Sequence, residues 1–116
     1  MEPEPSHPRL SEEALALVAS RFKVLSEPHR LRLLQELEAG ERSVSDLIQA
    51  TGYTQSNVSR HLQTLAEAGM LERRKDGVSV YYRIADPTII ELCRLMCGSL
   101  QRMLARRGKA LEMSAS

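Results

Sequence analysis

The sequence is poor in aromatic residues and has no long apolar segment. It contains no Trp, one Phe and three Tyr among 116 residues, so a core must be built from Leu, Ile, Val, Ala and Met. No run approaches the roughly 18 consecutive apolar residues that a membrane-spanning helix needs. The first residues lack the basic and apolar regions of a secretory signal. We therefore expect one cytoplasmic domain without membrane contact.

The chain also lacks a strong excess of either charge, because its net charge is only +1. The charge is unevenly distributed: residues 1–50 carry a net −3, whereas residues 54–83 and 84–116 each carry +2. Arg73, Arg74 and Lys75 are consecutive. Such a local basic patch is compatible with nucleic-acid binding but does not establish it.

Capping residues and apolar spacing predict five helices and one hairpin. Three of the five prolines lie in residues 1–10, which we expect to form a disordered arm. Residues 11–107 form the predicted domain, and residues 108–116 a frayed tail. Helices are expected over residues 11–25, 28–39, 43–50, 54–68 and 86–107, where apolar residues recur at helical spacing behind capping residues or proline.

After Gly69 the spacing of the apolar residues is no longer helical. Two strand-like runs, residues 71–75 and 78–84, flank Asp76-Gly77, a strong signal for a two-residue hairpin turn. Two short helices joined by a turn containing Gly52, and followed directly by a hairpin, predict a winged helix-turn-helix. The fold class is therefore mainly α with a small β-hairpin wing.

The predicted helix at 54–68 has one apolar face, formed by Val58, Leu62 and Leu65. Residues 54–63 contain no acid, which suits a surface that approaches phosphates. Gln, Arg and Ser side chains on the opposite face can bond base edges, and the start of such a helix enters the major groove. The candidate DNA contacts on this helix are Gln55, Ser56, Ser59 and Arg60. In the hairpin they are Arg73, Arg74, Lys75 and Ser79.

Three segments together resemble the ArsR/SmtB family: Leu25–Leu37, Ser43–Leu71 and Arg73–Ile84. The resemblance covers roughly residues 11–105. It implies a homodimer formed through the first and last helices, and repression by binding a double-stranded DNA operator of dyad symmetry until an inducer binds. It adds Thr54 and His61 to the candidate DNA contacts.

The apolar residues of the first and last helices support the dimer independently. Leu15, Val18, Phe22 and Leu25 line the first helix, and the last helix carries an apolar stripe about 20 residues long. A chain of this size has little other surface to cover them, so each helix needs a partner.

The inducer is not evident from the sequence. The resemblance places a thiol cluster near residues 42–46, where this chain has no Cys, and places His ligands along the last helix, which has none. Cys93 and Cys97 remain, spaced i, i+4 with Cβ atoms about 6 Å apart. They are either small buried hydrophobes, a site for a soft metal or metalloid ion, or a switch operated by thiol oxidation or persulfidation.

The three histidines do not form an expected metal site. His7 lies in the predicted arm, His29 begins a helix, and His61 suits a phosphate contact or a packed position.

Two other functional classes compete with a repressor. A winged-helix module that binds protein would favour acids or large apolar residues on the helix at 54–68. A thiol enzyme would place a base beside its Cys, and no His lies near Cys93 or Cys97 in the sequence.

Overall fold

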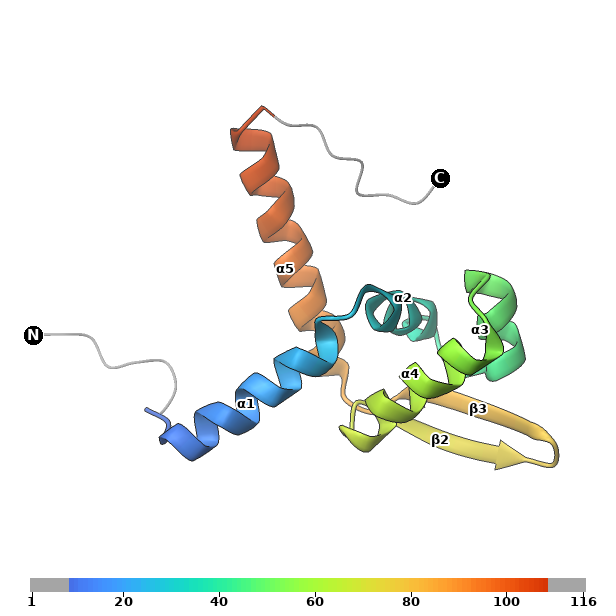
Figure 1. Cartoon of the computed structure of the whole chain (residues 1–116). Helices are drawn as coiled ribbons and strands as arrows, with labels where there is room; N and C mark the ends of the chain where they lie inside the picture. Colours follow the sequence, from blue (N-terminus) through green and yellow to red (C-terminus); the bar gives the residue numbers. More distant parts are fainter. Residues whose placement is uncertain (1–8, 109–116) are drawn as a thin grey trace, which may run out of the picture.

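The computed structural model describes residues 9–108 (Figure 1). Most of the predicted arm (1–10) and tail (108–116) therefore lies outside the described residues. All five predicted helices and the hairpin are present. The elements are α1 (Glu12–Leu25), α2 (Pro28–Leu37), β1 (Arg42–Ser43), α3 (Val44–Thr51), α4 (Gln55–Glu67), β2 (Leu71–Asp76), β3 (Ser79–Ile84) and α5 (Pro87–Arg106).

Side-chain caps determine where four of the helices begin. Ser11 accepts a hydrogen bond from the Ala14 N–H at 3.1 Å, and Asp86 accepts one from the Thr88 N–H at 3.0 Å. Ser43 and Thr54 cap α3 and α4 in the same way. Each bond satisfies an N–H group that has no partner within its own helix. The capping residues predicted from the sequence are confirmed.

The sheet differs from the predicted hairpin in two respects. Residues 42–43 form a short third strand, so the antiparallel order is β1-β3-β2. The two-residue turn is Gly77-Val78, one position later than predicted, because Asp76 pairs with Ser79. Gly77 has φ +61° and Val78 does not have a positive φ. This pattern places Gly at the first central position, as in a type II′ turn.

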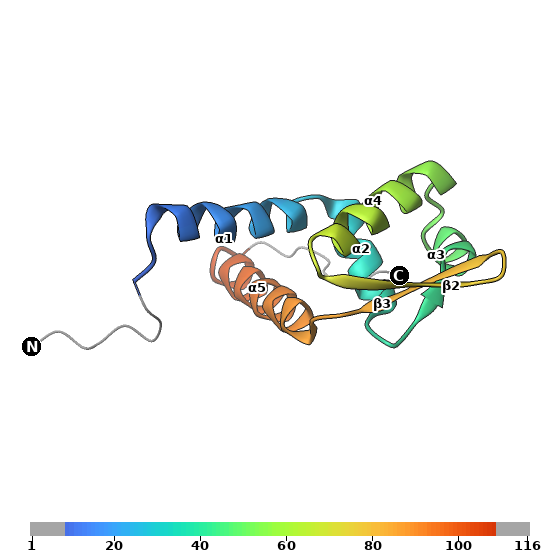
Figure 2. The ribbon, with the colours of Figure 1, turned by 90° about the horizontal axis from the view of Figure 1, so that it is seen from below.

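The core lies among α2, α3, α4 and the sheet. Leu33, Leu47, Val58, Leu62 and Met70 are fully buried within one apolar cluster. Seen from below, the hairpin extends beside α4 and beyond the core (Figure 2). The helices α1 and α5 extend away from this core (Figures 1 and 2). The radius of gyration is accordingly 17.0 Å, against about 13 Å for a compact domain of 100 residues.

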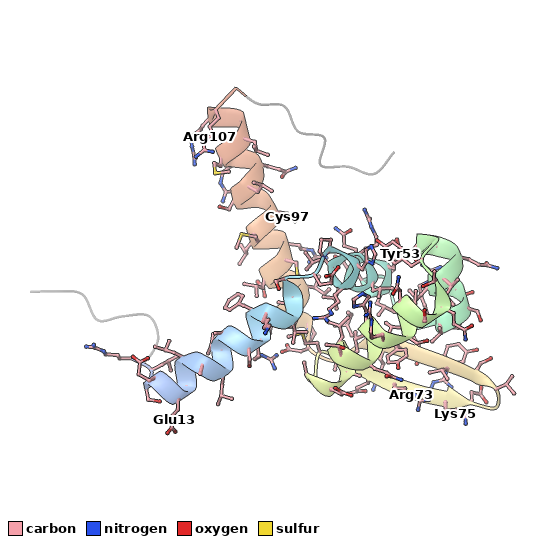
Figure 3. All side chains as sticks on the ribbon, in the orientation of Figure 1. Glu13, Tyr53, Arg73, Lys75, Cys97 and Arg107 are labelled. Atoms are coloured by element: carbon pink, nitrogen blue, oxygen red, sulfur yellow. The ribbon has the colours of Figure 1, made fainter. Side chains whose placement is uncertain are left out.

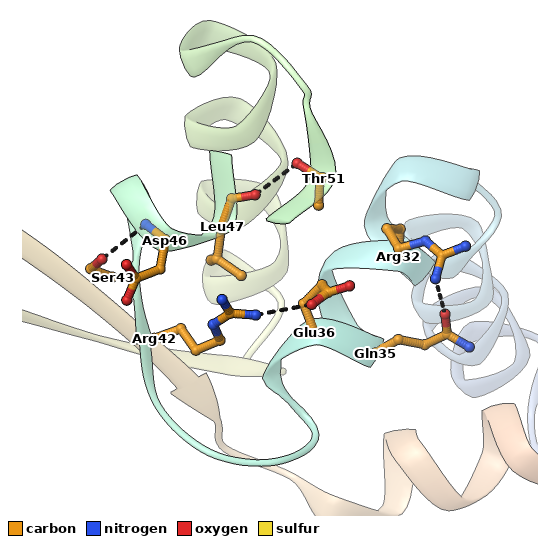
Figure 4. A network of polar contacts seen from close by, with 8 residues as sticks. All are labelled: Arg32, Gln35, Glu36, Arg42, Ser43, Asp46, Leu47 and Thr51. Atoms are coloured by element: carbon orange, nitrogen blue, oxygen red, sulfur yellow. Dashed lines mark hydrogen bonds and ion pairs between the residues drawn. The ribbon is translucent and has the colours of Figure 1, made fainter. Parts of the chain in front are cut away.

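Polar contacts fix α3 against α2 (Figure 4). Arg42, just before α3, forms an ion pair with Glu36 of α2 at 2.9 Å. At the end of α3 the Thr51 hydroxyl donates to the Leu47 carbonyl at 2.7 Å, and Gly52 adopts a left-handed conformation with φ +73°. The turn that leads into α4 is thereby set. Among residues 9–108, no helix is both long and apolar enough to cross a membrane.

Candidate nucleic-acid interface

The first turns of α4 present an exposed polar surface. Gln55, Ser56 and Arg60 are exposed, and Ser59 is partly exposed. Val58 and Leu62 on the opposite side are fully buried and hold the helix against the core. The first turn of α4 contains no acidic residue, so its N-terminal N–H groups and dipole remain available to an anion.

Two residues at the start of α4 organise this surface. The Thr54 hydroxyl accepts from the Asn57 N–H at 3.2 Å, so it serves as the helix cap. The Asn57 carboxamide oxygen in turn accepts from Arg60 Nη2 at 3.1 Å, which orients the guanidinium along the exposed face. Asn57 was not among the residues predicted from the sequence. Its spacing of three residues from Arg60 is the signal that could have identified it.

His61 lies on the buried side of α4 and does not belong to the exposed surface. Its side chain is 5% exposed, and Nδ1 accepts a hydrogen bond from Arg30 Nε at 3.1 Å. Burial, followed by the charges of Arg30 and Arg60, lowers the pKa of the His61 imidazole. The expectation that His61 contacts DNA is thus corrected in favour of a packed role, because its ring points into the protein.

The strand register divides the hairpin residues between two faces. Arg73 lies opposite Tyr82, and Lys75 lies opposite Val80. Because directly paired residues point to the same side and Tyr82 is buried, Arg73 and Lys75 continue the face that packs against α4. Both cations are exposed, and Lys75 lies nearer the tip of the hairpin than Arg73 (Figure 3).

Arg74 and Ser79 lie on the opposite face of the hairpin. Arg74 makes two hydrogen bonds to Glu41, at 2.8 and 3.1 Å, and its guanidinium lies 4.5 Å from the centre of the Tyr81 ring. The hydrogen bond lowers the pKa of the Glu41 carboxyl and raises the pKa of Arg74. The charge of Arg74 is therefore largely neutralised within the protein, unlike the charges of Arg73 and Lys75.

Two arginines link α1 to the middle and the C-terminal end of α4. Arg21 Nη1 donates to the carbonyl of Ala68, the C-cap of α4, at 3.0 Å. Arg30 donates through Nη1 to the Val24 carbonyl of α1 at 3.1 Å, while its Nε holds His61. We call Arg30 and its two acceptors the Arg30 clamp. These links were not predicted from the sequence, because the linked elements lie far apart in the chain.

The helices α1 and α5 expose large apolar side chains. On α1, Leu17 is 70% exposed and Phe22 is 52% exposed; on α5, Leu95 and Met96 are 67% and 63% exposed. No residue of α1 is buried, and Ile89 is the buried residue of α5. Large apolar side chains exposed on two helices are typical of an interaction site.

The two thiols lie on α5, and Cys97 is well separated from the hairpin residues Arg73 and Lys75 (Figure 3). Cys93 is half-buried, Cys97 is exposed, and both are free. Burial, and then the neighbouring Cys97, raises the pKa of the Cys93 thiol. Because the thiolate is the reactive form, Cys93 is not an activated nucleophile here.

The structure brings together three potential metal ligands that the sequence does not reveal as a group. Glu27, His29 and His61 each offer one ligand atom within 4.8 Å of the others. The His29 ring also stacks on Tyr53, with ring centres 4.0 Å apart.

Comparison with known proteins identifies the family. Residues 25–74 match a helix-turn-helix domain family. The HTH-type transcriptional regulator Rv0081 of Mycobacterium tuberculosis is 39% identical over 103 residues, which cover 88% of this chain and 90% of that protein. A homodimeric winged helix-turn-helix domain of Mycobacterium bovis, described as a possible ArsR-family regulator, is 30% identical with a TM-score of 0.72, covering 92% and 97% of the two chains. This chain belongs to the ArsR/SmtB family.

Crystal structures of similar proteins support the same fold. Rv0081 superimposes with a TM-score of 0.75 over 84% of this chain and 98% of its own. The antimony-specific repressor AntR is 31% identical, with a TM-score of 0.74 over 84% of this chain and 89% of its own. As an ArsR/SmtB protein, this chain is a DNA-binding transcriptional regulator with a winged helix-turn-helix fold.

Proposed function

We propose that this ArsR/SmtB protein is a homodimeric repressor that binds a dyad operator through α4 and one face of the hairpin. Gln55, Ser56, Ser59 and Arg60 read base edges in the major groove. Arg73 and Lys75 contact the DNA backbone beside it and set the register of the protein on the duplex.

The proposal rests on the position of the exposed start of α4 and of one face of the hairpin on the same side of the molecule. The exposed start of α4 has no acid, and the Arg73 and Lys75 side of the hairpin continues the face that packs on α4. The two elements therefore offer one cationic surface on one side of the molecule. Arg74 acts differently: its contacts with Glu41 and Tyr81 stiffen the wing rather than reach the DNA.

The second subunit covers the apolar surface of α1 and α5. Phe22, Leu95 and Met96 are all more than half exposed, and they lie on the two helices that extend from the core. A two-fold pairing buries the same surface on both subunits and brings two copies of α4 to successive half-sites. The homodimeric relative from Mycobacterium bovis supports this assignment.

Selection from random DNA duplexes tests the operator proposal, because it does not require the target sequence to be known. We expect the purified protein to enrich an inverted repeat whose half-sites lie about 10 base pairs apart, centre to centre. Arg60→Ala should relax the enriched sequence. Enrichment of no sequence, or the same sequence for wild type and Arg60→Ala, would contradict the assignment of α4 as the reading helix.

We propose further that a soft, thiophilic ion at Cys93 and Cys97 releases the operator. Both thiols are free and are spaced i, i+4 on one helix, so the same ion can bind both sulfur atoms once their protons are displaced. The site lies on α5, within the proposed dimer interface, where bound ions would change how the subunits pack. AntR, described as antimony-specific, provides a related case.

Operator release by arsenite, antimonite, cadmium, peroxide and polysulfide distinguishes these signals. We expect arsenite, antimonite or cadmium to release the wild type at lower concentration than peroxide or polysulfide. The variants Cys93→Ser and Cys97→Ser should not respond. Release of the double variant at the wild-type concentration would show that the thiols are packing residues.

A further inference from the structure

A cluster of three ligand-bearing side chains joins the start of α2 to the middle of α4. Glu27 is the N-cap of α2, His29 lies in its first turn, and His61 comes from the buried side of α4. Their ligand atoms lie within 4.8 Å of one another. Two imidazoles and one carboxylate suit borderline divalent ions such as Zn²⁺, Co²⁺ or Ni²⁺, not the thiophilic ions expected at α5.

The surroundings of the cluster allow the ligands to close on an ion. In a tetrahedral site the ligand atoms lie about 3.4 Å apart, so atoms that now lie up to 4.8 Å apart must approach by at most about 1.4 Å. Glu27 and His29 are half-buried at a helix start, where their side chains have room to adjust. Tyr53 stacks on the His29 ring at 4.0 Å and holds it near His61, whose ring centre is 5.8 Å away.

An ion at His61 excludes the hydrogen bond from Arg30. In this structure His61 Nδ1 accepts from Arg30 Nε at 3.1 Å, which requires a free lone pair on Nδ1. If the ion binds Nδ1, that lone pair is taken. If the ion binds Nε2, the proton of the neutral ring moves to Nδ1, which then cannot accept. In both cases metal binding opens the Arg30 clamp.

We propose that Glu27, His29 and His61 form a site for a divalent transition-metal ion that competes with the Arg30 clamp and thereby lowers operator affinity. The lowered affinity rests on the proposed function, whereas ion binding itself does not. The clamp joins α1, at the Val24 carbonyl, to the reading helix α4. Opening it removes the link between the middle of α4 and the helix that we assign to the dimer interface, and leaves the bond from Arg21 to Ala68 at the end of α4 in place.

The first test measures ion binding to the full-length protein without DNA. Co²⁺ is titrated into the Cys93→Ser/Cys97→Ser variant, so that thiolates cannot contribute, and its visible absorption is recorded. We expect a four-coordinate Co²⁺ spectrum, displaced by Zn²⁺. His29→Phe retains a ring against Tyr53 and removes the ligand, and Glu27→Gln retains an oxygen for the helix cap. Each should weaken Co²⁺ binding more than about tenfold.

The matched control for Glu27→Gln is Glu13→Gln, which changes an exposed carboxylate in the first turn of α1 and should leave Co²⁺ affinity unchanged. Equal Co²⁺ affinity for His29→Phe and the parent variant would overturn the site.

The second test measures binding to the selected operator with and without Co²⁺. We expect saturating Co²⁺ to weaken binding by about fivefold or more, the equivalent of one hydrogen bond in the dimer. His29→Phe should bind the operator with the parent affinity, and Co²⁺ should not change that affinity. An unchanged operator affinity in saturating Co²⁺ would refute the competition with the clamp. Failure of the metal-free protein to bind any selected operator would instead refute the proposed function.

Discussion

Removing the Arg30 clamp should destabilise the protein through a buried acceptor. Arg30→Met keeps an aliphatic side chain of similar length but removes every donor. His61 Nδ1, on a side chain only 5% exposed, then loses its partner, and so does the half-buried Val24 carbonyl. An unpartnered buried acceptor costs about 1–3 kcal/mol, and the second lost bond about 1 kcal/mol. We expect a total loss of about 2–4 kcal/mol per subunit.

Urea unfolding followed by circular dichroism measures this loss, at one protein concentration because the stability of a dimer depends on it. A double-mutant cycle isolates the His61 bond. In the His61→Phe background the acceptor is absent, so Arg30→Met should cost only about 1 kcal/mol, for the bond to Val24. Arg30→Lys, which retains one donor group, should lie between the wild type and Arg30→Met. Arg30→Met could lower the free energy of unfolding equally in the wild type and in His61→Phe, or by less than about 0.5 kcal/mol in the wild type. Either result would refute the role of the buried acceptor.

Three further predictions follow from the structure. Arg74→Ala should weaken operator binding less than about threefold and leave its salt dependence unchanged, because Glu41 already neutralises that charge; a reduced salt slope would place Arg74 on the DNA. The lowered pKa of His61 means that the unfolded chain takes up a proton first as the pH falls below about 6.5. The free energy of unfolding should therefore fall below that pH, and fall less steeply in His61→Gln; equal slopes would contradict a neutral buried ring. Phe22→Asp should convert the dimer to a monomer in sedimentation velocity, whereas the exposed control Glu13→Gln should not; a dimeric Phe22→Asp would exclude α1 from the interface.

Local signals in the sequence were sufficient for most of the secondary structure. Ser11, Ser43, Thr54 and Asp86 begin helices as predicted, because a cap acts on N–H groups two or three residues away. The hairpin turn was misplaced by one residue. Asp-Gly is read as the centre of a turn, but cross-strand pairing with Ser79 places Asp76 in the strand.

The site was harder to predict, because its organisation depends on contacts between distant residues. Strand alternation predicts that Arg73, Arg74 and Lys75 do not share one face, but it does not reveal that Arg74 pairs with Glu41, 33 residues earlier. The sequence left His61 as either a phosphate contact or a packed residue, and the bond from Arg30, 31 residues earlier, favours the packed position. Strand β1 was missed because two residues carry no periodicity, and it forms only through pairing with β3. No sequence pattern spans such separations.

Comparing Arg60→Ala with Lys75→Ala on the selected operator and on unrelated DNA, across a range of salt concentrations, tests the central claim most directly. If α4 reads bases and the hairpin holds the backbone, Arg60→Ala should weaken operator binding by about 1–3 kcal/mol and reduce the preference over unrelated DNA. Lys75→Ala should weaken binding to both DNAs equally and reduce the salt slope by about 1 per subunit. Unchanged operator preference in Arg60→Ala, together with an unchanged salt slope in Lys75→Ala, would contradict the assignment of this surface to DNA.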